Sequence, residues 1–167
     1  MAKKSQSAAS LQLAAEQPAA LYAVAGGVRS AGAWVAYRDA FLGSPAAAQI
    51  DAIRRGAPAG NLVGAAEALR LPRERVYELL GLSASTAKRK VAANEALDPL
   101  VTERLVRLGA IEKLAEDTFG DPLLAADWLQ AGNTGLGGVA PLSLLDTDIG
   151  CREVSRLLNA IAYGGAA

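Results

Sequence analysis

A short stretch of the chain, GLSASTAKRK at residues 81–90, combines a glycine and small hydroxyl residues with three consecutive cations. Ala84, Ala87 and Val91 recur at i, i+3 and i+7, which predicts a helix with one narrow apolar stripe that packs inward. The remaining arc of this helix would carry Ser85, Thr86, Lys88, Arg89 and Lys90. Small hydroxyls and long cations on one exposed helix face are suited to binding a polyanion.

The residues just before this stretch predict a second short helix. Pro72 can begin it, because the missing N–H costs nothing at the first helical position. Gly81 suits the left-handed residue that ends a helix, and Ser83 can cap the helix that follows. The buried face of the first helix would be formed by Val76, Leu79 and Leu80. Two short helices joined by Gly-Leu-Ser are typical of a helix-turn-helix motif.

In a helix-turn-helix motif the second helix enters the DNA major groove. Ser85, Thr86 and Arg89 would then face the bases. Four cations would lie nearer the phosphates: Lys88, Lys90, Arg73 and Arg75. The alternative is a cationic face that only meets solvent. The helix, the turn and the local positive charge together favour DNA as the ligand.

The formal net charge of zero hides a segregation along the chain. Residues 1–60 hold six Lys/Arg and three Asp/Glu, and residues 61–94 hold the same numbers. Residues 95–167 hold five Lys/Arg and eleven Asp/Glu. Basic blocks followed by an acidic block predict two faces with two partners, one of them polyanionic.

The overall composition predicts an all-α protein. The 167 residues are 51% hydrophobic, rich in Ala and Leu and only 5% aromatic, which favours helices over strands. One cysteine and no histidine exclude an intramolecular disulfide and Cys/His zinc sites, so we expect no metal and no cofactor. Cys151 is expected to be a small buried filler. No segment is long and apolar enough to span a bilayer, so we expect a cytoplasmic protein with no membrane partner.

The chain divides into four predicted regions. Residues 1–17 form a loose tail, and residues 18–60 a helical N-terminal extension that ends in a linker, GAPAGN at 56–61. Residues 61–97 form the helix-turn-helix DNA-binding region, and residues 98–167 a second small helical domain. In that domain a long helix begins at Asp98-Pro99 and ends at "GDP", residues 120–122.

The two helices that follow are predicted from their apolar spacing. The first would bury Leu124, Trp128 and Leu129. The second, capped by Thr147 or Asp148, would bury Ile149, Val154, Leu157, Leu158 and Ile161. Between them, GNTGLGG at 132–138 is expected to be a tight loop, because no preceding strand supports a phosphate-binding fingerprint.

Several of these residues also form an ordered pattern after Phe119. The pattern comprises Trp128-Leu129, Leu136-Gly137-Gly138, Pro141-Leu142, Leu145, Gly150, Val154, Leu157-Leu158 and Tyr163-Gly164. It resembles the C-terminal toxin-binding domain of Xre/MbcA/ParS-type antitoxins, and LLGLSASTAKRK resembles the helix-turn-helix that precedes it there. One departure is Thr134, where related chains often have proline.

The resemblance implies an antitoxin that forms a homodimer, binds operator DNA to repress its own operon and masks a toxin. The members most similar in this pattern are partnered with RES-domain toxins, enzymes that consume NAD. The toxin-binding residues it implies are Trp128, Leu136, Gly137, Pro141, Leu142, Tyr163 and Gly164. Trp128 also sits at core spacing, so Tyr163 is the better interface candidate.

Two other classes of function remain open at this stage. A free-standing helix-turn-helix transcription regulator would use the same DNA helix with a ligand-responsive C-terminal domain. An enzyme is the weakest alternative, because the chain has no histidine and no convincing polar cluster. A toxin gene next to this reading frame would distinguish an antitoxin from a free-standing regulator.

Overall fold

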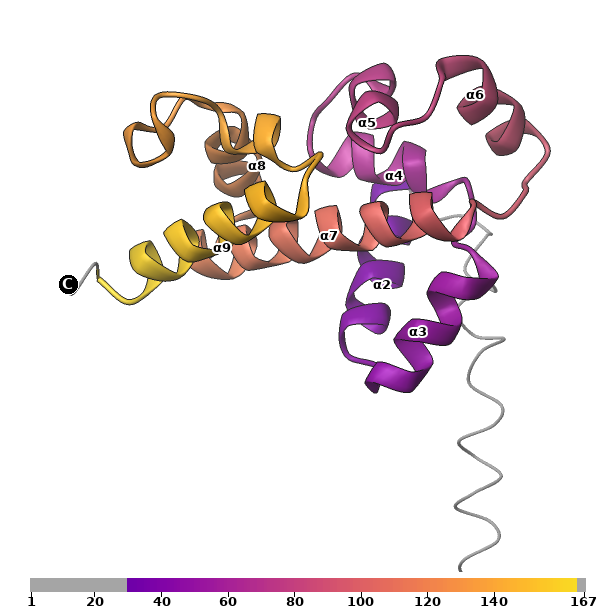
Figure 1. The fold of residues 1–167 in the computed structure, drawn as a ribbon, viewed down its shortest axis with the longest axis horizontal. Helices are drawn as coiled ribbons and strands as arrows, with labels where there is room; N and C mark the ends of the chain where they lie inside the picture. The colour runs from indigo at the N-terminus through magenta and orange to yellow at the C-terminus, as the bar shows by residue number, and fades with distance from the viewer. Residues whose placement is uncertain (1–29, 165–167) are drawn as a thin grey trace, which may run out of the picture.

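The computed structural model describes residues 30–164, and this part of the chain is built from helices (Figure 1). The α-helices are α2 (Ser30–Leu42), α3 (Ala46–Arg55), α4 (Asn61–Ala68), α5 (Arg73–Leu79), α6 (Ala84–Ala92), α7 (Pro99–Phe119), α8 (Pro122–Gln130) and α9 (Asp148–Ala162). Two short 3-10 helices, η2 (Thr134–Leu136) and η3 (Pro141–Leu144), lie between α8 and α9. The all-α class is confirmed. The predicted tail, residues 1–17, and the first part of the predicted extension lie outside the described residues.

The predicted helix-turn-helix is formed by α5 and α6. Gly81 has φ +71°, and a Cβ there would lie 2.2 Å from Nη1 of Arg104. The positive φ favours glycine, and the Arg104 guanidinium lies close to the space that a Cβ would fill. The Ser83 hydroxyl accepts a hydrogen bond from the Thr86 N–H at 3.2 Å, so Ser83 is the N-cap of α6 as predicted.

The longest helix, α7, has 21 residues and connects the two halves of the molecule. It packs against α2 and α3 as well as against α8 and α9, which lie beside its C-terminal half (Figure 1). Gly120, with φ +69°, ends α7, and Asp121 caps α8 by accepting hydrogen bonds from the N–H groups of Leu123 and Leu124. The predicted boundary at residues 120–122 is confirmed. No helix of residues 30–164 is both long and apolar enough to cross a bilayer.

Helix α2 belongs to the core, because it packs closely against α4. A Cβ on Gly64 of α4 would lie 2.3 Å from the carbonyl oxygen of Ser30 and 2.5 Å from Cβ of Trp34. Trp34 is fully buried at this contact. The Glu67 carboxylate of α4 accepts hydrogen bonds from the Ser30 hydroxyl and the Ala31 N–H, which satisfies the first turn of α2.

Residues 56–61, predicted to be a linker, are instead packed into the protein. Ala57 and Ala59 are fully buried. Their backbone pairs with a segment that we call the strap, residues 94–98: the Leu97 N–H donates to Ala57 at 2.8 Å, and the Ala59 N–H donates to Glu95 at 2.9 Å. The sequence prediction was wrong because these small residues serve close backbone packing, whereas Gly, Pro and Ala together are also typical of flexible linkers.

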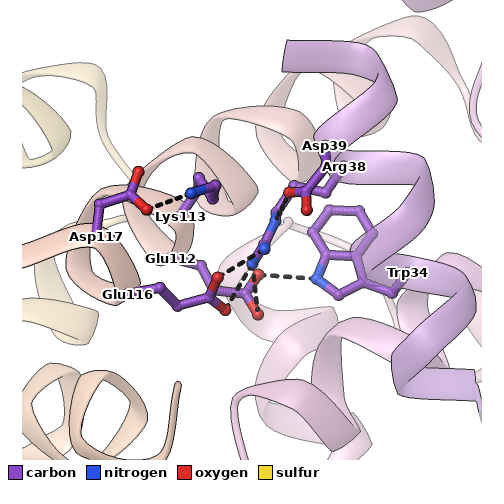
Figure 2. A network of polar contacts seen from close by, with 7 residues as sticks. All are labelled: Trp34, Arg38, Asp39, Glu112, Lys113, Glu116 and Asp117. Carbon is purple, nitrogen blue, oxygen red and sulfur yellow. Dashed lines mark hydrogen bonds and ion pairs between the residues drawn. The ribbon is translucent and has the colours of Figure 1, made fainter. Parts of the chain in front are cut away.

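A buried polar cluster joins α2 to α7 (Figure 2). Arg38 of α2 is only 2% exposed. Its Nη1 and Nη2 donate to the two carboxylate oxygens of Glu116 at 2.8 and 2.7 Å, and its Nη1 lies 3.3 Å from Oε1 of Glu112. The indole N–H of Trp34 donates to Oε2 of Glu112 at 2.8 Å, and Nε of Arg38 donates to Asp39. The cluster therefore fixes the position of α7 against α2 through a bidentate ion pair.

Three carboxylates surround one guanidinium in this cluster, so the single positive charge of Arg38 would not balance three negative charges. Burial raises the pKa of Glu112 from 4.5 to about 7, and the opposing effects of Arg38 and of the Trp34 hydrogen bond only partly offset the burial. Burial by itself would lower the pKa of Arg38, but its hydrogen bond to Glu116 and the charge of Glu112 raise that pKa above its ordinary value.

The raised pKa of Glu112 predicts how stability depends on pH. The contribution of a carboxyl group with a raised folded-state pKa is fully present below its unfolded pKa and is lost as pH rises through the folded pKa. The free energy of unfolding should therefore fall by about 2 kcal/mol between pH 5.5 and pH 8 on account of Glu112. Glu112→Gln keeps an oxygen to accept from Trp34 and should remove this part of the slope. Urea unfolding at both pH values measures it, and identical slopes in the two proteins would contradict the assignment.

Candidate DNA-binding and toxin-binding surfaces

The inward side of α6 differs from the predicted stripe. Ala87 is fully buried and Val91 is half-buried, but Ala84 is exposed. The face that packs inward is formed by Thr86, Ala87, Lys90 and Val91. Ala84 lies in the first turn of α6, ahead of the residues that meet the strap. Of the three residues in the predicted apolar stripe, only Ala87 and Val91 therefore pack inward.

Lys90 does not point into solvent but contacts the strap, residues 94–98. Its side chain is 12% exposed, and its Nζ donates to the Ala96 carbonyl at 3.1 Å and lies 3.6 Å from Glu95 and 3.8 Å from Asp98. Lys90 thus fastens the strap to α6, and the prediction that it lies on the exposed arc was wrong. The spacing within α6 could not reveal this, because all three contacts come from residues beyond the end of the helix.

Ser85, Lys88 and Arg89 remain on one exposed face of α6. The hydroxyl of Thr86, at the edge of this face, accepts a hydrogen bond from the Ser83 hydroxyl at 2.9 Å. Arg73 and Arg75 of α5 are also exposed. The structure therefore brings together most of the predicted DNA-binding residues, and their role in binding stays a prediction.

Carboxylates that the sequence analysis did not single out lie beside these cations. Nζ of Lys88 is 3.2 Å from Glu74, Nη1 of Arg89 is 2.5 Å from Glu95, and Arg75 pairs with Glu78 at 3.1 Å. A hydrogen bond to its own backbone and the neighbouring Lys88 lower the pKa of Glu74. Only the i, i+3 pair of Arg75 and Glu78 could have been found from spacing.

The glycine-rich loop before α9 is a compact turn around η2. The side chain of Asn133 accepts a hydrogen bond from the Gly135 N–H at 2.9 Å, and the Asn133 carbonyl accepts from the Gly138 N–H at 2.8 Å. Gly137 and Gly138 have φ values of +72° and +87°, which favour glycine. The expectation of a tight loop is confirmed, with Thr134 as the first residue of η2.

The start of α9 is packed tightly against η3. The Thr147 hydroxyl accepts from the Gly150 N–H at 3.0 Å and is the N-cap, one of the two candidates from the sequence. A Cβ on Gly150 would lie 1.9 Å from the Leu144 carbonyl oxygen. Cys151 is buried as predicted, and burial raises the pKa of its thiol.

The buried faces of α8 and α9 are narrower than predicted. On α8 the buried residues are Ala125, Ala126 and Leu129, and on α9 they include Cys151, Val154 and Leu158. Leu124, Ile149 and Ile161, which were predicted to be buried, are 57%, 68% and 41% exposed. These three residues lie near the helix ends, beyond the line of side chains that faces the core.

Exposed apolar side chains are concentrated after residue 120. Of the eight large apolar residues exposed in residues 30–164, six lie there: Leu123, Leu124, Val139, Ile149, Ile161 and Tyr163. Tyr163 is 82% exposed and follows the end of α9. Covering such side chains with a partner would remove apolar surface from water.

The predicted toxin-binding residues fall into three groups by exposure. Gly137, Tyr163 and Gly164 are exposed. Leu136 and Trp128 are half-buried, and the Trp128 ring lies 5.5 Å from that of Phe119. Pro141 and Leu142 are buried in η3. The exposed residues are open to a partner and the buried pair is not, and the assignment of all seven to toxin binding stays a prediction.

Comparison with known families matches both halves of the chain. Residues 48–109 match the antitoxin Xre-like helix-turn-helix domain, and residues 114–164 match the antitoxin Xre/MbcA/ParS C-terminal toxin-binding domain. Helix α7 begins in the first match and ends in the second. The long helix α7 therefore contributes residues to both matched domains.

Curated relatives agree with the family matches. The chain is 33% identical over 141 residues to the Prs ADP-ribosylating antitoxin of Sphingobium sp. strain YBL2, covering 79% of this chain and 88% of that protein. It is 28% identical over 95 residues to the antitoxin Xre of Yersinia enterocolitica and 29% identical over 90 residues to that of Photorhabdus laumondii. The match covers 56% and 53% of this chain and 64% and 61% of those two relatives.

The fold and both matches define a helix-turn-helix protein with a C-terminal toxin-binding domain. The chain belongs to the Xre-type antitoxin family.

The contact between η3 and α9 gives a test of the C-terminal domain. Gly150→Ala should destabilise the protein by about 1–3 kcal/mol, because the added methyl group would overlap the Leu144 carbonyl. Gly60→Ala is a matched control, because Gly60 has helical backbone angles and open space where a Cβ would lie. The stability of this variant should equal that of the unchanged protein or exceed it by less than about 1 kcal/mol. Thermal unfolding measures both, and equal stability of the two variants would contradict the packing described.

Proposed function

We propose that this antitoxin binds and neutralises a RES-type, NAD-consuming toxin through residues 98–167, and that it is not itself an enzyme. The observation that carries the proposal is the concentration of exposed apolar residues, with Tyr163 at its end, in the domain that matches the toxin-binding description. The name of the Sphingobium relative refers to ADP-ribosylation, a chemistry that consumes NAD, and this supports a toxin that uses NAD.

We further propose that residues 61–97 bind operator DNA and repress the operon of this antitoxin. Support comes from the match to the helix-turn-helix description and from the exposed face of Ser85, Lys88 and Arg89 on α6. One short helix reads few base pairs, so the binding unit would be a homodimer on two half-sites. The family match favours this function over a free-standing regulator that responds to a small ligand.

DNA binding is tested by removing one cation from the exposed face of α6. Arg89→Ala should weaken binding to the operator by about 1–3 kcal/mol if Arg89 hydrogen-bonds a guanine, with a smaller loss on DNA of scrambled sequence. Arg156→Ala on α9 removes the same charge from an exposed ion pair in the other domain and serves as the control. Fluorescence anisotropy on both duplexes measures the effect. Equal operator affinity of the two variants would contradict the assignment of α6.

Toxin neutralisation is tested at Tyr163. Tyr163→Ala should weaken the complex with the toxin encoded beside this gene by about 2 kcal/mol or more, because truncating an aromatic anchor at an interface centre is costly. Folding and DNA binding should not change, since the side chain is 82% exposed. Ile50→Ala, an exposed apolar residue on α3, is the matched control. Calorimetry and co-expression survival measure the effect, and full protection by Tyr163→Ala would exclude Tyr163 as an anchor.

A further inference from the structure

The exposed cations of the proposed DNA-binding surface are held by carboxylates of the same chain. On α6, Lys88 pairs with Glu74 at 3.2 Å and Arg89 with Glu95 at 2.5 Å. The side chains of both cations are more than 60% exposed, so the pairs lie at the surface that would meet DNA. A phosphate that binds these cations must compete with a carboxylate already in place.

The position of Glu95 is fixed by the fold. Its backbone N–H donates to the Lys90 carbonyl at 2.9 Å, and its own carbonyl accepts from Ala59 at 2.9 Å. The next residue of the strap, Ala96, forms an antiparallel bridge with Pro58 and accepts from Lys90. The backbone of Glu95 is therefore held beside α6, which keeps its carboxylate within reach of Arg89.

Glu74 is held beside α6 in a second, independent way. It lies in the first turn of α5, the first helix of the helix-turn-helix motif, and reaches Lys88 across the turn. Negative charge in the first turn of a helix is favoured by the helix dipole. A hydrogen bond to its own backbone, and after it the pairing with Lys88, lower the pKa of Glu74 and favour the charged carboxylate.

Such ion pairs affect the binding of non-specific DNA and of a specific DNA site differently. Non-specific binding comes from cation–phosphate contacts, so each cation occupied by a carboxylate removes about one contact and lowers the salt dependence by about 0.9 in log–log slope. A guanine edge offers two acceptors in fixed positions, and Arg89 has further N–H groups beyond the Nη1 that Glu95 occupies. A base contact can therefore be made while the pair persists.

We propose that Glu74 and Glu95 determine the DNA specificity of this protein by competing with DNA phosphates for Lys88 and Arg89. Each carboxylate weakens binding to duplexes of arbitrary sequence more than binding to the preferred site. The inference rests on the proposed DNA-binding function of α6 and adds the residues that restrict it.

The test compares Glu95→Gln and Glu74→Gln with the wild-type chain. Glutamine keeps an acceptor oxygen for the neighbouring side chains and removes the charge, and circular dichroism checks that each variant is folded. The probes are a duplex selected by the wild-type chain from a random pool and a duplex of scrambled sequence, each titrated over a range of salt concentrations. Each variant should bind the scrambled duplex about two- to fivefold more tightly, with a steeper salt dependence by about one unit and a lower ratio of specific to non-specific affinity.

Glu153→Gln is the matched control, because Glu153 forms an exposed pair with Arg156 on α9 and its loss changes the net charge equally. Scrambled-duplex affinities and salt slopes of Glu95→Gln and Glu74→Gln equal to those of Glu153→Gln would overturn the inference. A separate variant with Lys88 and Arg89 both replaced by alanine tests the underlying function. If that variant loses DNA binding while the glutamine variants match the control, the inference fails and the proposed DNA-binding function stands.

Discussion

The structure depends on a buried arginine. Arg38 brings a full charge into the core, and the contacts of Glu116 and Glu112 compensate for the water that it loses. A buried charge left without these partners would be strongly unfavourable, so the cluster favours the observed register of α2 against α7. Trp34 strengthens the same register by donating to Glu112 while its ring packs against Gly109. The helix that precedes both family matches is thus fixed to the helix that both matches share.

Helix α7, which the Arg38 cluster fixes against α2, also contacts the elements that carry the two candidate surfaces. Its N-terminal half follows the strap, which is fastened to α6 through Lys90 and to residues 57–59 through backbone hydrogen bonds. Its C-terminal half supports α8 and α9, which carry four of the eight large apolar residues exposed in residues 30–164. A bend in α7 would therefore move the DNA-binding helix and the toxin-binding domain relative to each other.

The two surfaces differ in the way they are prepared for a partner. On α6 the exposed cations Lys88 and Arg89 already have carboxylate partners, so a phosphate that bound them would exchange one charged partner for another. On α8 and α9 apolar side chains are exposed without compensation, so a partner would gain from removing them from water. Segregation of charge along the sequence indicated two partners, and the structure shows two chemically different surfaces.

The sequence by itself determined the helices, their caps and the family. The Gly81 turn, the Ser83 cap and the break at residues 120–122 follow from local conformational preferences, which act over a few residues and can be read from spacing. For the last helix these preferences left Thr147 and Asp148 as candidate caps, and the structure selects Thr147. Tertiary structure alone decided which of these side chains are exposed to solvent and which contact other parts of the chain. Lys90 lies within α6 and Glu95 lies three residues after its end, yet their contacts depend on how the strap pairs with residues 57–59. Leu124, Ile149 and Ile161 match a buried pattern and are nevertheless exposed, because helical spacing gives the direction of an apolar side chain but not whether a neighbouring element covers it.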